Sequence, residues 1–330
     1  MDTPTPSATP TPLPTPTPTE VALTTPTRRT LSVGLVGSDD AEWRVLSARE
    51  GLQRAAREQD VEVFDLPSQP GDLARNASRL AESGYDLVIV ASAHPEMGLW
   101  LAKRFPLTRF AVFGAIPDPA PANLVGLVFA EDQAGFLAGA LAGWLTERDM
   151  VAFVGAGPTV EIVKYRKGYE HGVQYVNTKA VVLGKYLDSF TAPEKGAAEA
   201  AAQLDEGADV LFAAGGATAL GALETAAERG VAVIASEVDP YQSRPAVASR
   251  LVAAALVRAD VAVQEVIKAT KQGAFKPGTL TFDAKNGGIA LGPYHGAGTA
   301  LPDEAKAQLR RIFDGLREGT IKTNVEIPEY

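Results

Sequence analysis

Polar side chains follow several short apolar runs of this sequence at the points where the runs end. Glu237 ends the run VAVIASE, for example, and two glycines end the run DVLFAAGG. Carboxylates in such places accept hydrogen bonds from hydroxyl or ring N–H groups of a ligand, at about 1.5–3 kcal/mol for each buried charged hydrogen bond. The candidate ligand contacts of this kind are Asp40, Ser92, Asp132, Gly215, Gly216, Glu237 and Asp239.

An aromatic residue in a similar position could also contact a ligand. Trp43 follows the run LSVGLV and an acidic turn, where a strand leads into a helix. An aromatic side chain at the ligand-binding edge of a sheet can stack on a ring, which adds roughly 0.5–1.5 kcal/mol beyond the burial of surface. The alternative for Trp43 is a half-buried position on a helix.

Structural roles compete with several of these ligand contacts. Asp40 and Asp132 could each cap a following helix by accepting hydrogen bonds from its first N–H groups. Gly215 and Gly216 allow a ligand oxygen to approach the start of a helix, but close packing alone would also explain them. The sequence leaves both alternatives open.

Groups that would support an enzymatic reaction are missing from the sequence. There is no G-x-S-x-G motif, no G-x-x-x-x-G-K-[ST] phosphate loop and no cysteine. The three histidines, His94, His171 and His295, lack the spacing of metal ligands. The segment FVGAGPTVEI has only two glycines of a dinucleotide fingerprint. Hydrogen-bond acceptors without an activated nucleophile favour binding over catalysis, with no metal or cofactor.

Composition excludes two further classes of protein. The 330-residue chain carries a formal net charge of −9 and has a pI near 5.0, so it repels nucleic acid. The stretch AGFLAGALAGWLT is shorter than the roughly 18 residues that a membrane-spanning helix needs. We therefore expect a globular protein with no nucleic-acid partner and no membrane span.

The first 30 residues differ in composition from the rest of the chain. They alternate proline with threonine, as in PTPTPTPTE, and have little apolar surface to bury. Such segments form extended, semi-rigid spacers, so we expect residues 1–30 to be a disordered tether. A tail without a role is the alternative. Neither a signal peptide nor an acylatable cysteine stands in this sequence, so a lipid anchor, if there is one, lies outside it.

From Leu31 onward, short apolar runs alternate with segments of helical periodicity. This alternation predicts an α/β protein with a doubly wound parallel sheet. The proline-rich segment AIPDPAPAN interrupts the pattern, which then begins again. We expect two similar lobes around a central cleft, with residues 31–127 plus 255–283 in the N-terminal lobe and residues 128–254 plus 284–330 in the C-terminal lobe.

Several stretches together resemble a known family. They are FAEDQAGFLAGALAGWLT, KGYEHGVQYVN, the segment from YLDSFTAPEKG to GVAVIA, and GGIALGPYHGAG with LPDEAKAQL. These stretches are similar to the basic membrane protein family of substrate-binding lipoproteins, which includes purine nucleoside receptors of bacterial ABC transporters. The resemblance extends from Leu31 to about Ile321 and implies a type I periplasmic-binding fold with a hinge.

The resemblance also implies roles for two aromatic residues. Asp40 and Trp43 are similar to the acidic residue and the base-stacking aromatic that follow the first strand in the family, but Arg44 stands where the family has asparagine. Phe190 matches the second stacking aromatic, whereas Ala192 stands where an aspartate is usual. Trp43 and Phe190 would hold a flat ring between the lobes.

For the ribose hydroxyls the resemblance implies a carboxylate after the last strand of the second lobe. Glu237 or Asp239 matches this position. A family lysine falls near Val257 in this sequence, with Arg258 beside it as a candidate ligand contact.

The sequence as a whole predicts a non-enzymatic, extracytoplasmic solute receptor of an ABC transporter. We expect a monomer that binds a nucleoside or similar ring-bearing molecule, delivers it to a permease, and is tethered to the outer face of the cell membrane. A ligand-sensing signalling module of the same fold is one alternative. An enzyme of nucleoside or sugar-phosphate metabolism is the other.

Overall fold

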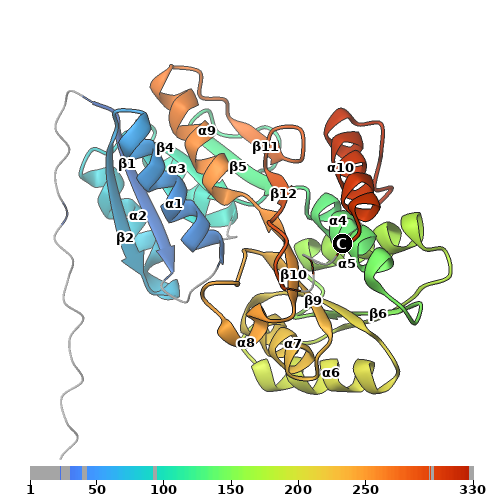
Figure 1. Ribbon diagram of the computed structural model, residues 1–330. Helices are drawn as coiled ribbons and strands as arrows, with labels where there is room; N and C mark the ends of the chain where they lie inside the picture. Colours follow the sequence, from blue (N-terminus) through green and yellow to red (C-terminus); the bar gives the residue numbers. More distant parts are fainter. Residues whose placement is uncertain are drawn as a thin grey trace, which may run out of the picture.

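The protein has two α/β lobes, each built on a six-stranded sheet with helices on both faces (Figure 1). The computed structural model describes residue 23 and residues 30–38, 43–91, 95–296, 298 and 301–326. Two doubly wound, almost entirely parallel sheets were predicted from the sequence, and this fold class is confirmed.

The strands of the N-terminal lobe are in the order β11-β5-β4-β3-β1-β2 and are all parallel. Helices α1 and α9 cover one face of this sheet, and α2 and α3 cover the other. The elements of this lobe are β1 (Ser32–Ser38), α1 (Trp43–Glu58), β2 (Glu62–Ser68), η1 (Pro70–Asp72), α2 (Leu73–Glu82), β3 (Leu87–Ala91), α3 (Pro95–Arg104), β4 (Arg109–Phe113), β5 (Leu124–Phe129), α9 (Ala259–Lys271) and β11 (Gly278–Phe282).

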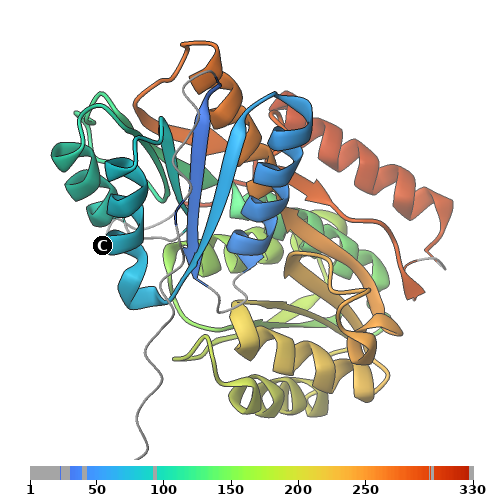
Figure 2. The same cartoon turned by 90° about the vertical axis from the view of Figure 1, so that its left-hand side faces the viewer.

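In the C-terminal lobe the order is β12-β10-β9-β8-β6-β7, and only β12 is antiparallel to its neighbour. Helices α4 and α5 lie on one face, with α10 packed on α4, and α6 and α7 lie on the other (Figure 2). The elements are α4 (Glu131–Leu145), β6 (Met150–Gly155), α5 (Val160–Val176), β7 (Val181–Tyr186), α6 (Pro193–Asp205), β8 (Val210–Ala214), α7 (Gly216–Glu228), β9 (Ala232–Glu237), α8 (Pro245–Ala248), β10 (Leu251–Val257), β12 (Ile289–Leu291) and α10 (Asp303–Glu318).

Burial explains why the central strands are apolar at every position. All residues of β3 (LVIVA) and β8 (VLFAA) are buried, because helices cover both faces of each sheet. The edge strand β7 (VVLGKY) has no fully buried residue. The apolar runs of the sequence therefore mark the middle of each sheet, and the carboxyl ends of these strands face the space between the lobes.

The chain crosses between the lobes three times, and hydrogen bonds join the crossings. The N–H of Ala130, after β5, donates to the carbonyl of Phe282 at the end of β11 (2.9 Å). The N–H of Arg258, after β10, donates to the carbonyl of Gly288 before β12 (2.8 Å). The crossings thus lie at residue 130, residue 258 and residues 283–288, whereas the sequence suggested changes of lobe at 127/128, 254/255 and 283/284.

The predicted tether lies outside the described residues, apart from Leu23 and Thr30. Leu23 is half-buried and packs against the core between α2, α3 and their sheet. Among the helices that the structure describes, none is both long and apolar enough to cross a membrane.

Candidate functional site

At the carboxyl edge of the C-terminal sheet, an aromatic ring packs against the backbone of two glycines. The side chain of Phe190 is 41% exposed although it is large and apolar. Its ring lies so close to Gly157 and Gly215 that a Cβ atom on either glycine would be 3.3 Å from a ring carbon. Gly215 and Gly216 both have positive φ angles (111° and 60°), and a Cβ on Gly216 would be 2.6 Å from the carbonyl oxygen of Phe190. These two glycines therefore position the aromatic loop, as well as the start of α7.

Thr218 in the first turn of α7 fixes the loop that carries this ring. Its buried hydroxyl donates to the carbonyl of Ser189 (2.7 Å) and accepts a hydrogen bond from the N–H of Ala192 (3.0 Å). The N–H of Thr218 also donates to the carbonyl of Phe190 (3.3 Å). Three hydrogen bonds thus fix the loop that carries Phe190, and a side chain held by the protein itself loses less entropy when it binds a ligand.

Glu237 ends β9 in a strained backbone conformation. Its φ angle is +73°, and the N–H of Val238 donates to the carbonyl of Ser236 (2.8 Å), so Glu237 is the central residue of a γ-turn. Strained residues of this kind cluster at ligand sites, where the surrounding structure holds them in place. The residue is only 8% exposed. A buried carboxylate is thus held rigidly at the carboxyl edge of the sheet.

One arginine of the N-terminal lobe meets three carboxylates of the C-terminal lobe. Burial alone would lower the pKa of Arg44, in the first turn of α1, but the charges of Glu161, Glu237 and Glu131 outweigh this effect and raise the pKa. Glu161 lies in the first turn of α5, and Glu131 begins α4. These four groups therefore come together where the two lobes face each other.

Lys164 neutralises one of the three carboxylates directly. Its Nζ atom donates to Oε2 of Glu131 (3.1 Å) and to the carbonyl of Phe129 (3.0 Å). Glu131 is almost fully buried, and this burial raises its pKa despite the opposing charges of Lys164 and Arg44. The five charged groups sum to one negative charge, so the cleft is suited to neutral or cationic ligands.

Three of the predicted contacts lie wholly or partly outside the described residues. Asp40 and Ser92 lie outside the described residues. Trp43 is the first residue of α1, but its side chain also lies outside the described part. The position of its backbone puts it next to Arg44, on the lobe that faces Phe190.

Two predicted carboxylates contact other segments of the chain. Asp132, one residue after Glu131, accepts a hydrogen bond from the hydroxyl of Thr323 in the C-terminal segment. Asp239 lies 2.7 Å from Nε2 of His295, whose ring stacks on Tyr241 at 3.9 Å between centroids. The structure brings neither into the cluster around Arg44, because each carboxylate already has a partner elsewhere.

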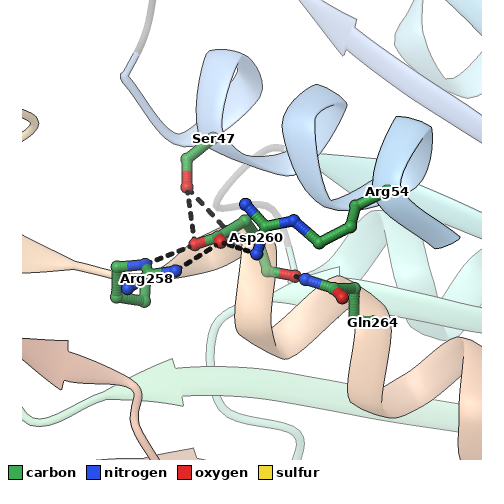
Figure 3. Close-up of polar contacts among 5 residues, drawn as sticks. All are labelled: Ser47, Arg54, Arg258, Asp260 and Gln264. Atoms are coloured by element: carbon green, nitrogen blue, oxygen red, sulfur yellow. Dashed lines mark hydrogen bonds and ion pairs between the residues drawn. The ribbon is translucent and has the colours of Figure 1, made fainter. Parts of the chain in front are cut away.

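Arg258 belongs to a buried joint between α1 and α9 in the N-terminal lobe (Figure 3). Its guanidinium forms two hydrogen bonds to Asp260, at 2.8 and 2.7 Å. Asp260 is 2% exposed, its N–H donates to the Ser47 hydroxyl (3.0 Å), and Arg54 of α1 reaches the same carboxylate at 3.3 Å. Asp260 therefore joins the two helices, and Arg258 pairs with the carboxylate that does so.

Of the five charged residues that the structure brings together, only Glu237 is predicted as a ligand contact from the sequence. Arg44 stands where the family has asparagine, and the sequence points to Asp132 instead of its neighbour Glu131. Glu161 and Tyr165 are four residues apart on α5 and therefore share a face, a spacing that the sequence contains. The sequence does not show, however, which face of α5 is turned toward the other lobe.

The chemistry of the site is that of recognition. It offers a half-exposed aromatic ring, a rigid carboxylate and a cluster of charged groups, all at the cleft between two hinged lobes. Among the described residues there is no group of three or more His, Asp or Glu side chains placed to hold a metal ion.

The chain as a whole is similar to several known proteins. The family model described as "ABC transporter substrate-binding protein PnrA-like" matches residues 37–328. The "ABC transporter nucleoside-binding protein BmpA" of Lactococcus lactis subsp. cremoris is 27% identical over 291 residues, which cover 82% of each chain. "Basic membrane protein A" of Borreliella burgdorferi is 30% identical over 188 residues, and this chain spans only 55% of its length.

A solved structure confirms the type of fold. The solute-binding protein of an ABC transporter system from Conexibacter woesei has a TM-score of 0.74 at 22% identity, with 88% of this chain and 98% of that chain covered. The predicted periplasmic-binding fold with two lobes is therefore confirmed.

Proposed function

Because the chain belongs to the family of PnrA-like ABC transporter substrate-binding proteins, we propose that it binds a nucleoside or a similar ring-bearing solute between its lobes. The resemblance to the basic membrane protein family, inferred from the sequence, is confirmed. The protein is a solute receptor of an ABC transporter by family. Its ligand and its assembly are the subject of the proposal.

The observation that carries the proposal is the position of Phe190. Its ring is 41% exposed, packs against two glycines and lies on a loop that three hydrogen bonds fix. Such an aromatic platform can stack on a flat ring of a ligand. Trp43 at the start of α1 would supply the second face of the stack. Glu237 would accept hydrogen bonds from the hydroxyls of a ribose. The nucleoside-binding relative from Lactococcus lactis supports the same ligand class.

The remaining parts of the function follow from the family. We propose that the receptor acts as a monomer on the outer side of the cell membrane, tethered through residues 1–30, and delivers its ligand to a permease. We also propose that it has no enzymatic activity, since recognition groups make up the described site.

Thermal unfolding of the purified protein with a panel of nucleosides, free bases and simple sugars tests this proposal. A ligand at about one hundred times its dissociation constant adds roughly 2.7 kcal/mol to the free energy of unfolding, so the melting temperature should rise by several degrees. We expect the rise with nucleosides and not with simple sugars, which lack a flat ring to stack. A rise with another class of solute alone would refute nucleoside binding while leaving the receptor function in place.

Substitution of Phe190 tests whether its ring contributes to ligand binding. Phe190→Ala should weaken binding severalfold with little change in stability, because much of the ring is exposed. Tyr175→Ala is the control, since Tyr175 is a 53% exposed aromatic on α5 that packs on Phe136 instead of facing the site. Equal affinities of the Phe190 variant and the wild type would exclude the platform.

A further inference from the structure

One buried tyrosine hydroxyl near the charged cluster lacks a hydrogen-bond partner in the part of the chain that the structure describes. The side chain of Tyr165 on α5 is fully buried, and its hydroxyl oxygen has no partner among the described residues. Its ring packs edge-on against Phe212 of β8, at 6.0 Å between centroids. Leaving such a hydroxyl without a hydrogen bond costs about 1–3 kcal/mol, so a partner that arrives with the ligand would explain why it is present.

Charged groups surround this hydroxyl. Burial raises the pKa of Tyr165 well above its ordinary value, and the negative charges of Glu237 and Glu131 raise it further. Arg44 and Glu161 act on the same hydroxyl. Glu161 lies one turn before Tyr165 on the same face of α5, and Arg44 follows Trp43 directly at the start of α1. The guanidinium, the carboxylate and the hydroxyl therefore lie in one region, on elements next to Trp43.

The donor groups of Arg44 and the acceptor groups of Glu161 suit the edge of a 6-oxopurine better than the edge of adenine. A 6-oxopurine presents the acceptors O6 and N7 next to the donor N1–H, and arginine recognises O6 and N7 with two hydrogen bonds. Adenine presents an amino donor at position 6 and an unprotonated N1. Its amino group would replace the acceptor O6 with a donor facing the guanidinium, and its N1 would place an acceptor against the carboxylate. Two of the three hydrogen bonds would thus be lost, and only the one to N7 would remain.

We infer that Arg44, Glu161 and Tyr165 form a specificity site that selects nucleosides of 6-oxopurines over adenosine. Arg44 donates to O6 and N7, Glu161 accepts from N1–H, and the Tyr165 hydroxyl completes the contacts to the base. Glu237 remains the partner of the sugar hydroxyls. This inference rests on the proposed binding of nucleosides.

Calorimetric titration of the full chain with inosine, guanosine and adenosine tests the inference. We expect the wild-type protein to bind inosine and guanosine about 5- to 150-fold more tightly than adenosine, the range that one good two-bond contact provides. Arg44→Gln should reduce this preference to less than about threefold. Tyr165→Phe should weaken inosine binding about fivefold without lowering the melting temperature, because it removes a hydroxyl that has no partner among the described residues.

Tyr169→Phe is the matched control. Tyr169 lies one turn further along α5 and is also fully buried, with a hydroxyl that has no partner among the described residues. The carboxylate that acts on the Tyr169 hydroxyl is that of Asp209, at the other end of β8 from the cluster around Arg44. Removal of the Tyr169 hydroxyl should therefore leave ligand affinity unchanged. Circular dichroism of each variant would verify the fold.

The outcomes separate this inference from the proposed function. Adenosine bound as tightly as inosine, or a Tyr165→Phe variant with unchanged affinity, would overturn the specificity site and leave nucleoside binding intact. Failure of every nucleoside to bind would overturn both.

Discussion

Single hydroxyl groups decide how firmly the aromatic platform is held. The hydroxyl of Thr218 is buried and connects α7 to the loop before α6 by two hydrogen bonds. Thr218→Val keeps the shape of the side chain but leaves the N–H of Ala192 and the carbonyl of Ser189 without these partners. We expect the free energy of unfolding in urea to fall by about 1–3 kcal/mol, and ligand affinity to fall with it.

Thr225→Val, on the same helix, is the control for this substitution. Among the described residues the Thr225 side chain has no hydrogen bond, so its loss should change neither stability nor affinity by a measurable amount. A Thr218 variant as stable as the Thr225 variant would show that the loop does not depend on these bonds.

The ion pair of Arg258 and Asp260 predicts a pH dependence of stability. Burial alone would raise the pKa of Asp260, but the hydrogen bonds and charge of Arg258, with the charge of Arg54, outweigh it and lower the pKa. A carboxyl whose pKa is lowered by folding stabilises the protein above its unfolded pKa, near 4, and this contribution is lost as the pH falls toward the folded value. Asp260→Asn should therefore lower the free energy of unfolding by about 3 kcal/mol at pH 7 and by much less at pH 3.

Urea unfolding at both pH values measures this difference, with Asp188→Asn as the comparison. Asp188 also has a lowered pKa, because Lys195 donates a hydrogen bond to it, but the pair is exposed to solvent. Its substitution should have little effect at either pH. A difference for Asp260→Asn that is as large at pH 3 as at pH 7 would contradict the role of its charge.

At the residue scale the sequence predicts positions better than contacts. Phe190, Gly215, Gly216 and Glu237 all lie at the carboxyl edge of the second sheet, as their places after apolar runs predict. Asp132 is also at such a place, but on a helix adjacent side chains point about 100° apart. A shift of one residue therefore decides whether a carboxylate joins the cluster around Arg44, as Glu131 does, or contacts the C-terminal segment, as Asp132 does. The order of residues alone does not predict the direction of these side chains.

Among the elements, α4 and α5 pack with their backbones in direct contact. Gly135, Gly139 and Gly143 are spaced four residues apart on α4 and face α5. A Cβ on Gly139 would lie 2.1 Å from the carbonyl oxygen of Tyr169. The small residues of AGFLAGALAGWLT thus serve the packing of two helices.

Gly139→Ala tests this contact, because two effects of opposite sign compete. Alanine favours a helix over glycine by about 1 kcal/mol, whereas overpacking against backbone costs about 1–3 kcal/mol and can cost more. Since neither backbone can move without separating the helices, we expect a net fall in melting temperature. Gly71→Ala in η1 is the control, since a Cβ there would have no atom within 4 Å. A Gly139 variant at least as stable as the Gly71 variant would disprove the close packing.

The fold as a set of elements follows from the sequence because burial on both faces of a sheet demands apolar runs. The changes of lobe are less predictable. β10 remains in the second sheet to Val257, and the chain crosses at Arg258, because pairing with β9 and β12 continues to that point. Pairing between distant strands determines these limits, and local composition does not report it.

At the scale of the whole molecule, opposite charges on the two lobes attract each other. Arg44 is the positive partner that the N-terminal lobe offers to Glu161, Glu237 and Glu131 of the C-terminal lobe. The three hydrogen-bonded crossings form a hinge about which the lobes can move, and such domain motions are the common response of two-lobed binding proteins to ligands. The attraction therefore favours the closed arrangement before a ligand arrives.

Arg44→Ala removes this attraction and should open the ligand-free protein. A compact chain of this length has a radius of gyration of about 20 Å, and we expect X-ray scattering to show a rise of roughly 1 Å. Arg54→Ala is the control, because Arg54 pairs with Asp260 inside one lobe and its loss removes the same charge without affecting the cleft. Identical radii for the Arg44 variant and the wild type would mean that the hinge alone sets the arrangement of the lobes. A rise for both variants would mean that net charge sets it, since a chain with a formal net charge of −9 becomes more negative in either case.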